Sequence, residues 1–468
     1  MKKIILRTLG IILILGVLGG IYYINSLTPV ITGYAAKNLA SGIFAGNRTQ
    51  ESLEKTDLNF SFIKFTKNTV DYGKKEVSSR FLWAKSKAIY IDGFGCTLVR
   101  GDENLIRNRQ YRNAPLPEIN PDTIAWPAGD QLTDTIPSGI DLIKLNQALI
   151  RAFNDSVGNR GTFAVAIAYK NQLIAEKYRK GFSEKNRFLS WSMAKSFTHA
   201  LVGIMVKKGK MDVHQPTGIS EWKNDDRAGI TIDQLMHMNS GLEWNEDYGN
   251  LSDVTIMLHK APDMAEFTYK KKLIATPGTK WVYNSGATNI VTYLIRRKLS
   301  DDSVYFEFPR RGLFNPTGMR SAIFETDASG NFAGSSYIYA SMRDYVRFGL
   351  LYLNKGNWLG NQLLPTGWTD YAAQPAQGSK GQYGSFFWLN LSGDYPDVPK
   401  DLFMCRGHDG QYIYIIPSLQ LVVVRTGCSK KDDFNAQAFL TSIVNTISKK
   451  NNKIINNLKN TQINKLKM

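Results

Sequence analysis

The stretch Phe188-Leu-Ser-Trp-Ser192-Met-Ala-Lys195-Ser-Phe-Thr-His-Ala-Leu201 is the part of the sequence that decides the fold. Its apolar side chains recur at helical spacing and predict a helix with one apolar face, formed by Met193, Phe197, Ala200, Leu201 and Ile204. Ser192 and Lys195 are three residues apart, so they are neighbours on such a helix, and they lie away from its apolar face.

A serine followed one helical turn later by a lysine has a chemical meaning. A serine hydroxyl is a poor nucleophile until a base lies within hydrogen-bond reach, and a lysine can be that base only if burial or nearby positive charge lowers its pKa. The start of a helix also offers free N–H groups to a developing oxyanion. The S-x-x-K spacing recurs at Ser52/Lys55, Ser61/Lys64 and Ser220/Lys223. An exposed serine and lysine on an amphipathic helix is therefore an open alternative for this segment alone.

A second segment, Pro277-Gly-Thr-Lys-Trp-Val-Tyr283-Asn284-Ser285-Gly286, predicts a tight loop of the kind that presents catalytic side chains. Tyr283 is a candidate to take the serine proton, if Lys195 holds it as phenolate, or to pass a proton to the leaving group. The alternative is a packed tyrosine whose hydroxyl has an ordinary structural partner.

A third segment, Arg406-Gly407-His408-Asp409-Gly410-Gln411, comes directly before an apolar run that predicts a strand from residue 412. Glycines at the start of a strand allow the backbone to approach a ligand closely. Main-chain N–H groups there can complete an oxyanion hole with that of Ser192, and His408 can bind substrate or assist proton transfer. A structural histidine at a strand end is the alternative.

In this order the three segments make the chain resemble the serine β-lactamase-related family, which includes class C β-lactamases, D-alanyl-D-alanine carboxypeptidases and related esterases and amidases. The resemblance runs from about residue 135 to 447 and extends to three further stretches, which are Ile230-Thr-Ile-Asp-Gln-Leu-Met-His-Met-Asn-Ser-Gly-Leu242, Leu313-Phe-Asn-Pro-Thr-Gly-Met319 and Ser341-Met-Arg-Asp344. It implies an α/β (α+β) fold of the β-lactamase/transpeptidase type, with a central antiparallel sheet flanked by helices and a mostly helical subdomain.

The resemblance also implies roles for individual residues. Ser192, Lys195 and Tyr283 correspond to the catalytic residues, and the main-chain N–H groups of Ser192 and Gln411 correspond to the oxyanion donors. Ser285, His408, Gly410 and Gln411 are the expected substrate-binding or oxyanion residues. The expected reaction is hydrolysis of a small-molecule or peptide-like substrate through an acyl-enzyme on Ser192, without a cofactor or a metal.

Two departures from class C β-lactamases narrow the expected activity. The sequence has Tyr283-Asn284-Ser285 in place of Tyr-x-Asn, and His408-Asp409-Gly410 in place of the Lys-Thr-Gly that helps to bind the β-lactam carboxylate. This pattern, together with Gly93-Phe-Gly-Cys96, looks more similar to the esterase and 6-aminohexanoate-dimer hydrolase branch. We therefore expect an esterase or amidase. The alternatives are a β-lactamase, a D-alanyl-D-alanine carboxypeptidase, or a non-catalytic penicillin-binding-like sensor.

Patterning elsewhere in the catalytic region agrees with one antiparallel sheet. A helix is predicted over 141–154 and a last helix over 434–447, and hairpins are predicted from strands at 162–169 and 173–178 and at 412–416 and 421–425. Strands near both ends with helical patterning over much of 192–370 predict a sheet with a mostly helical insertion beside it.

The N-terminus predicts a membrane anchor or a signal peptide. Lys2, Lys3 and Arg7 precede an apolar run over residues 9–24, and no clear A-x-A cleavage site follows. The positive-inside rule places the remainder outside the cytoplasm, on the periplasmic side of the inner membrane, or secreted if the segment is cleaved. The predicted domains are this segment at 1–28, an extension at 29–130 with a Pro-rich linker at 115–127, a hydrolase domain at 131–447, and a basic disordered tail at 448–468.

Composition excludes few functions. The hydrophobic share of 43% and the charged share of 21% are ordinary for a globular protein. The net charge of +18 suggests nucleic-acid binding, but the basic residues are scattered and no nucleic-acid-binding motif accompanies them, so we expect none. Three cysteines without CxxC spacing, and five histidines without H-E-x-x-H, do not support a zinc site. Pairing of Cys405 with Cys428 remains open.

Overall fold

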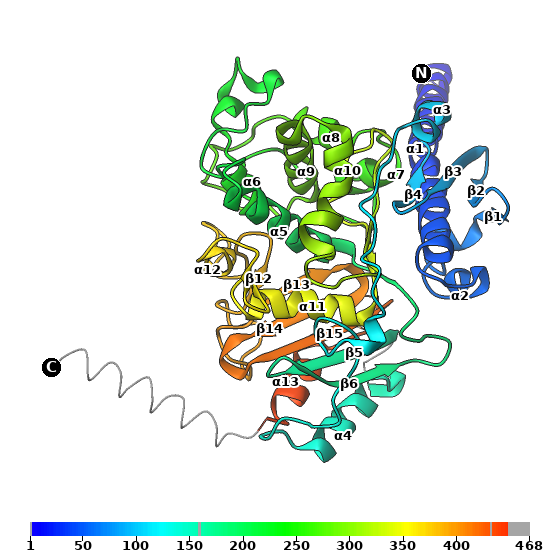
Figure 1. The fold of residues 1–468 in the computed structure, drawn as a ribbon. Coiled ribbons are helices and arrows are strands. Elements are labelled where there is room, and N and C mark those ends of the chain that lie inside the picture. The colour runs from blue at the N-terminus through cyan, green and yellow to red at the C-terminus, as the bar shows by residue number, and fades with distance from the viewer. Residues whose placement is uncertain (1, 158–160, 431–432, 448–468) are drawn as a thin grey trace.

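The structure is a computed structural model that describes residues 2–157, 161–430 and 433–447. Its centre is a six-stranded antiparallel sheet in the order β12-β13-β14-β15-β5-β6 (Figure 1). The strands are β5 (Thr162–Tyr169), β6 (Gln172–Tyr178), β12 (Trp388–Leu389), β13 (Phe403–Gly407), β14 (Gln411–Ile416) and β15 (Leu421–Gly427). Both predicted hairpins are confirmed, and β15 pairs with β5, so the two ends of the domain meet in one sheet.

Helices cover both faces of this sheet (Figure 1). On one face α11 (Met342–Leu353) packs against β5, β14 and β15. On the other face α4 (Leu142–Ala152), whose first turn is capped by Asp141, packs against α13 (Ala436–Val444). All eight residues of β5 are consequently buried, which explains why this strand is almost continuously apolar instead of alternating.

A mostly helical region lies beside the sheet (Figure 1). It contains α6 (Ile232–Met236), α7 (Asp253–His259), α8 (Met264–Tyr269), α9 (Ser285–Leu299) and α10 (Asp302–Pro309). Between it and the sheet runs α5 (Ala194–Lys207), which contacts both β13 and α9. The predicted apolar face of α5 is buried, but the structure shows that its other side is buried as well, because both layers press against it.

Smaller elements connect these layers. The strands β7 (Phe188–Leu189), β8 (Ile323–Phe324) and β9 (Ile338–Ala340) form a short sheet just before the α5 segment. A second pair, β10 (Asn357–Trp358) and β11 (Asn361–Gln362), precedes α12 (Trp368–Ala372). The short sheet fixes the chain that leads into α5.

The N-terminal extension is built on one helix, α1 (Lys2–Phe44), so the boundary predicted at residue 28 falls inside a continuous element. Pro29 does not end the helix, because the turns after it are held by packing, with Ala35, Ala36 and Leu39 fully buried. A four-stranded sheet packs along this part of α1 and consists of β1 (Lys67–Asp71), β2 (Glu76–Phe81), β3 (Ala84–Ile91) and β4 (Gly95–Leu98). The short helices α2 (Gln50–Lys55) and α3 (Glu103–Arg107) complete the extension.

The extension is joined to the catalytic domain by buried polar contacts. Lys37 on α1 forms an ion pair with Glu325, and both side chains are almost fully buried. The Pro-rich stretch then runs across the domain, where the side chain of Asn315 donates a hydrogen bond of 2.8 Å to the carbonyl of Pro115.

Candidate active site

Ser192 lies in a single 3-10 turn, Trp191–Met193, that leads directly into α5. Trp191 has a left-handed backbone with a φ of 44°, which for a tryptophan is uncommon and requires support from its surroundings. Part of that support comes from Ser190, whose hydroxyl donates to the carbonyl of Ser336 and accepts from the N–H of Ile338. The turn therefore fixes the nucleophile position at the start of the helix.

Lys195 lies directly behind the candidate nucleophile. Its Nζ is 2.9 Å from Oγ of Ser192, 2.9 Å from Oγ of Ser285 and 3.1 Å from the carbonyl oxygen of Ser335. The side chain is only 1% exposed, and burial lowers the pKa of Lys195 to about 8, against a smaller opposing effect of Glu246. An amine with this pKa is deprotonated in part of the molecules at neutral pH and can accept the serine proton.

The three other S-x-x-K pairs lack such an environment. Ser61, Lys64, Ser220 and Lys223 are all exposed, and Lys55 is exposed beside a half-buried Ser52. In water a lysine keeps its proton at neutral pH. Burial therefore distinguishes Ser192 and Lys195 from the other matches to the motif.

Tyr283 comes directly before α9, whose N-cap Asn284 accepts a hydrogen bond from the N–H of Ala287. The ring centre of Tyr283 is 4.9 Å from Nζ of Lys195. Burial and then the charge of Glu246 raise the pKa of Tyr283 well above its ordinary value, although hydrogen bonding with Ser192 and the nearby Arg406 oppose this. Tyr283 is thus a neutral phenol, suited to donate a proton, whereas Lys195 is suited to accept one.

Glu246 is a site residue that the sequence did not reveal. Its carboxylate accepts hydrogen bonds from the hydroxyl of Ser285, from the N–H of Ser285 at 3.0 Å and from Nε1 of Trp244 at 2.5 Å. Ser285 therefore lies between Lys195 and Glu246 and connects them. Glu246 belongs to a polar loop without periodicity or a metal-type pattern, so no feature of the sequence singled it out.

Ser192 opens into a cavity of about 690 Å³ between the sheet edge and the helical region. Aromatic side chains form much of its wall, and Ser192 shares the lining with Tyr248, Tyr283, Trp388, Tyr395, Arg406, Gly407, His408, Asp409, Gly410, Tyr412, Lys430 and Phe434, among others. Four of the predicted site residues, Ser192, Tyr283, His408 and Gly410, thus line one cavity. Two more, Lys195 and Ser285, contact Ser192 or each other behind it.

Gln411 is placed differently from the other predicted residues. Its side chain turns away from the cavity, where it donates to the carbonyl of Gly427 at 2.6 Å and accepts from the N–H of the same residue at 3.0 Å. The residue begins β14 opposite Gly407 of β13. Its main-chain N–H belongs to the ladder position opposite Gly407, and the oxyanion role expected for this N–H stays a prediction.

His408 is held between aromatic rings at the cavity wall. Its imidazole stacks on Tyr248, with ring centres 4.6 Å apart, and meets the edge of Trp191 at 5.4 Å. Loss of water around the ring lowers the pKa of His408, although the carboxylate of Asp409 opposes this. Asp409 itself is 2.9 Å from Nζ of Lys430. His408 is therefore uncharged at neutral pH, unlike the lysine that it replaces.

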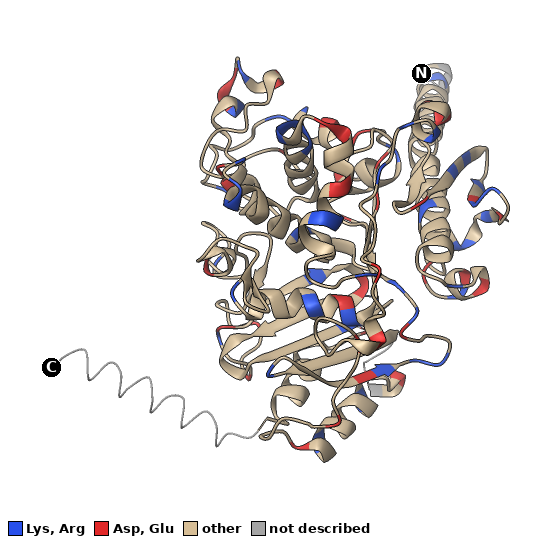
Figure 2. Cartoon of the chain, viewed as in Figure 1, with Lys and Arg blue, Asp and Glu red and all other residues tan. Residues whose placement is uncertain are grey.

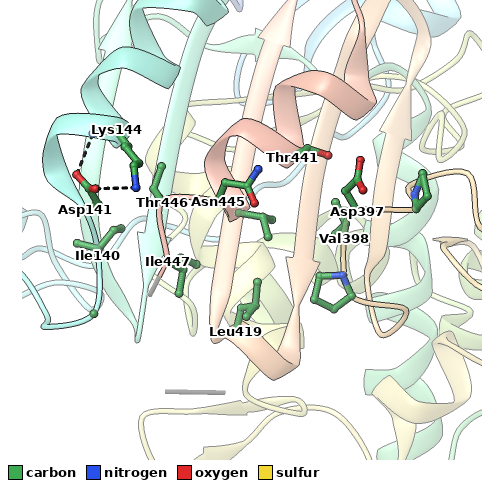
Figure 3. Close-up of a pocket in the computed structure, with 14 residues that line it drawn as sticks. Ile140, Asp141, Lys144, Asp397, Val398, Leu419, Thr441, Asn445, Thr446 and Ile447 are labelled. Atoms are coloured by element: carbon green, nitrogen blue, oxygen red, sulfur yellow. Dashed lines mark hydrogen bonds and ion pairs between the residues drawn. The ribbon is translucent and has the colours of Figure 1, made fainter. Parts of the chain in front are cut away.

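A larger hollow, of about 1020 Å³, lies near α4 and α13 (Figure 3). Its lining includes Asp141, Lys144, Asp397 and Thr441, and Lys144 is paired with Asp141. Among the residues that the structure describes, no serine, histidine or cysteine lines it. Size alone therefore does not identify the active site, and the cavity at Ser192 is the candidate.

Charge and cysteines add little to the site. Lys and Arg are interspersed with Asp and Glu over most elements (Figure 2). Among the described residues there is no group of three or more His, Cys, Asp or Glu that could hold a metal ion. Cys96, Cys405 and Cys428 are all free thiols, so Cys405 and Cys428 are not paired.

The sheet flanked by helices, with a serine and a lysine buried together at the start of α5, defines the class of serine hydrolases with the β-lactamase fold. The chain belongs to the Beta-lactamase family, whose family model matches residues 146–438.

Several known proteins are similar to this chain. A 6-aminohexanoate-dimer hydrolase of Paenarthrobacter ureafaciens is 25% identical over 222 residues, which are 45% of this chain and 56% of that protein. A Bacillus anthracis structure, provisionally named a 6-aminohexanoate-dimer hydrolase, is 21% identical and superposes with a TM-score of 0.55. The match covers 72% of this chain and 88% of the Bacillus anthracis chain. A family VIII carboxylesterase is 13% identical and superposes with a TM-score of 0.52. The match covers 68% of this chain and 99% of the carboxylesterase chain. The two structures support the same fold.

Proposed function

We propose that this protein hydrolyses an ester or a linear amide through an acyl-enzyme on Ser192. The observation that carries the proposal is the buried contact of 2.9 Å between Nζ of Lys195 and Oγ of Ser192. Lys195 takes the hydroxyl proton as Oγ attacks the carbonyl carbon, and the main-chain N–H groups of Ser192 and Gln411 hold the oxyanion. Tyr283 gives a proton to the leaving group, and water then releases the acyl group.

The cavity wall favours esters and linear amides over β-lactams. In the related lactamases a lysine and a threonine at this position help to bind the substrate carboxylate, whereas here His408 is neutral and Asp409 is paired with Lys430. Neither the neutral His408 nor the Asp409–Lys430 pair therefore offers the unpaired cation that such a carboxylate needs. The relatives named for 6-aminohexanoate-dimer hydrolysis and for carboxylic ester hydrolysis support the same substrate classes.

One observation supports a second candidate, cleavage of peptides that end in a free carboxylate, such as D-alanyl-D-alanine peptides. Arg406 lines the cavity with its guanidinium 5.2 Å from the ring centre of Trp388. Within the described part of the chain it forms no ion pair with a carboxylate. The guanidinium of Arg406 is therefore available to form an ion pair with the carboxylate of such a substrate.

We also propose that α1 anchors the protein in a membrane, with the catalytic domain on the periplasmic side. Within the described residues α1 is the helix long and apolar enough to cross a bilayer. Residues 4–24 are almost entirely exposed, and at 1.5 Å per residue they extend over about 31 Å, which matches the hydrocarbon thickness. The basic N-terminal end is the end that stays in the cytoplasm.

A substrate panel tests the proposed activity. The purified full chain in detergent is assayed with p-nitrophenyl esters, linear amides of aminocarboxylic acids, D-alanyl-D-alanine peptides and nitrocefin. We expect turnover of an ester or a linear amide and little of nitrocefin. Strong nitrocefin hydrolysis would contradict the role given to His408 and Asp409, and turnover of the D-alanyl peptides alone would favour the second candidate.

A further inference from the structure

Two large apolar side chains stand exposed at the tip of the hairpin between β2 and β3. Leu82 is 63% exposed and Trp83 is 62% exposed, although both belong to residue types that are rarely left in water together. Leu82 has a φ of 52°, the left-handed conformation of a tight hairpin turn, so its position at the tip is fixed by the backbone.

The hairpin tip lies at the end of α1 where the exposed apolar segment stops. Nε1 of Trp83 donates a hydrogen bond of 3.1 Å to Oδ1 of Asn25, and residues before Asn25 form the proposed membrane span. Further along β3, Ser86 is 2.8 Å from Thr32, and Tyr90 lies against Phe44. The strand thus runs beside α1, with its tip toward the bilayer.

Positive charge lies just behind the apolar tip. Arg80 and Lys85 are directly opposite each other in the β2–β3 register, and both are exposed. Like charges in cross-strand positions destabilise a hairpin unless something compensates them. Neither residue forms an ion pair with a carboxylate of the described chain. A layer of anionic lipid headgroups would compensate both charges, while Trp83 has the side chain typical of the membrane interface.

The active-site loop reaches the same level of α1. The hydroxyl of Tyr23 donates a hydrogen bond of 3.3 Å to Oδ1 of Asn250. Asn250 lies two residues after Tyr248, which lines the cavity and stacks on His408. The loop that carries Glu246 and Tyr248 is therefore close to the plane where α1 leaves the proposed span.

We infer that the Leu82–Trp83 tip is a second membrane contact, which inserts into the interface of an anionic bilayer beside α1 and holds the active-site loop at the membrane surface. This inference rests on the proposed membrane span of α1. A helix alone leaves the domain free to rotate and tilt, whereas a second contact fixes its orientation.

The test uses the full chain in nanodiscs that contain anionic lipid, in a Cys428→Ser background. A polarity-sensitive fluorophore is attached to a single cysteine introduced as Leu82→Cys, Tyr72→Cys or Ile14→Cys. Tyr72 is the matched control, because it is also 63% exposed and lies in the turn between β1 and β2 of the same sheet, yet its ring centre is 6.1 Å from that of Phe44 at the far end of α1. Quenching by lipids with a spin label near the headgroup is then compared among the three sites.

We expect quenching at position 82 to exceed that at position 72 by at least about twofold, because interfacial side chains lie at the headgroup level, and to fall when Arg80→Ser and Lys85→Ser are combined. Equal quenching at positions 82 and 72, together with quenching at position 14 by spin labels deep in the bilayer, would overturn the inference. The proposed membrane span of α1 would still stand in that case. Absence of quenching at position 14 would overturn the membrane span itself, and the inference with it.

Discussion

Nζ of Lys195 lies 2.9 Å from Oγ of Ser192, in surroundings where burial lowers the pKa of the lysine to about 8. The distance is that of a hydrogen bond, and the lowered pKa provides an amine that can lose its proton near neutral pH. Ser285 and Glu246 extend the same network behind the lysine. Four of the predictions below follow from this arrangement.

The pH dependence of kcat/KM reports the protonation state of Lys195 in the free enzyme. Because the charged amine cannot accept a proton, activity is low below the pKa, rises about tenfold per pH unit and levels off above about 8. The measurement is ester hydrolysis from pH 5.5 to 9.5 in buffers of constant ionic strength. A profile that is flat or falling across that range would contradict a lysine base.

Glu246→Gln should move this profile toward lower pH. The carboxylate of Glu246 raises the pKa of Lys195, so removing its charge lowers that pKa further, while glutamine can still accept the hydrogen bond of Ser285. Glu243→Gln, an exposed change in the same loop, is the control and should leave the profile unchanged. Coincident profiles for both variants and the parent would show that Glu246 does not act on the lysine.

Tyr283→Phe removes one hydroxyl and keeps the ring, which packs on Trp388 with centres 5.2 Å apart. If the phenol is the proton donor, kcat falls by about 10²-fold or more with little change in the unfolding temperature. Tyr395→Phe, which alters another tyrosine of the same cavity, should retain most activity. Turnover in Tyr283→Phe within a fewfold of the parent would assign proton donation elsewhere.

The Lys37–Glu325 ion pair should be essential for attaching the extension to the domain. Lys37→Met leaves a buried carboxylate without its partner, which costs about 3–5 kcal/mol in the free energy of unfolding. The double variant Lys37→Met/Glu325→Gln should recover much of that loss, because no buried charge remains. Urea unfolding in detergent measures the free energy of unfolding of each variant. Removal of the exposed ion pair between Lys270 and Glu266 is the control and should change this free energy little. Equal stability of the Lys37→Met variant and the parent would refute this assignment.

The sequence predicted those parts of the fold that local patterns specify. The hairpin of β5 and β6 is an example, because two largely apolar runs of residues flank a short polar turn. The bounds of both strands were predicted to within one or two residues. Ser192, Lys195 and Tyr283 were singled out as candidates because their spacing and order are typical of a serine hydrolase site, and the structure brings them together. The structure adds the burial that separates Lys195 from three other motif lysines.

Features that arise only from tertiary packing could not be predicted. The continuation of α1 to Phe44 depends on contacts with a sheet that lies later in the chain, so an isolated apolar run gave no sign of it. Tyr34 on this helix stacks on Trp191 with centres 6.2 Å apart, which couples the extension to the nucleophile turn. The side chains of Glu246 and Gln411 likewise take their partners from distant segments.

Formation of an acyl-enzyme on Ser192 is the central claim, and intact-protein mass spectrometry tests it most directly. The parent, Ser192→Ala and Ser220→Ala are each mixed with a p-nitrophenyl ester, quenched with acid and weighed; Ser220 is the control because it belongs to an exposed S-x-x-K pair. The account predicts a mass increase of one acyl group in the parent and in Ser220→Ala, and none in Ser192→Ala. An acyl adduct and unchanged turnover in the Ser192→Ala protein would contradict it.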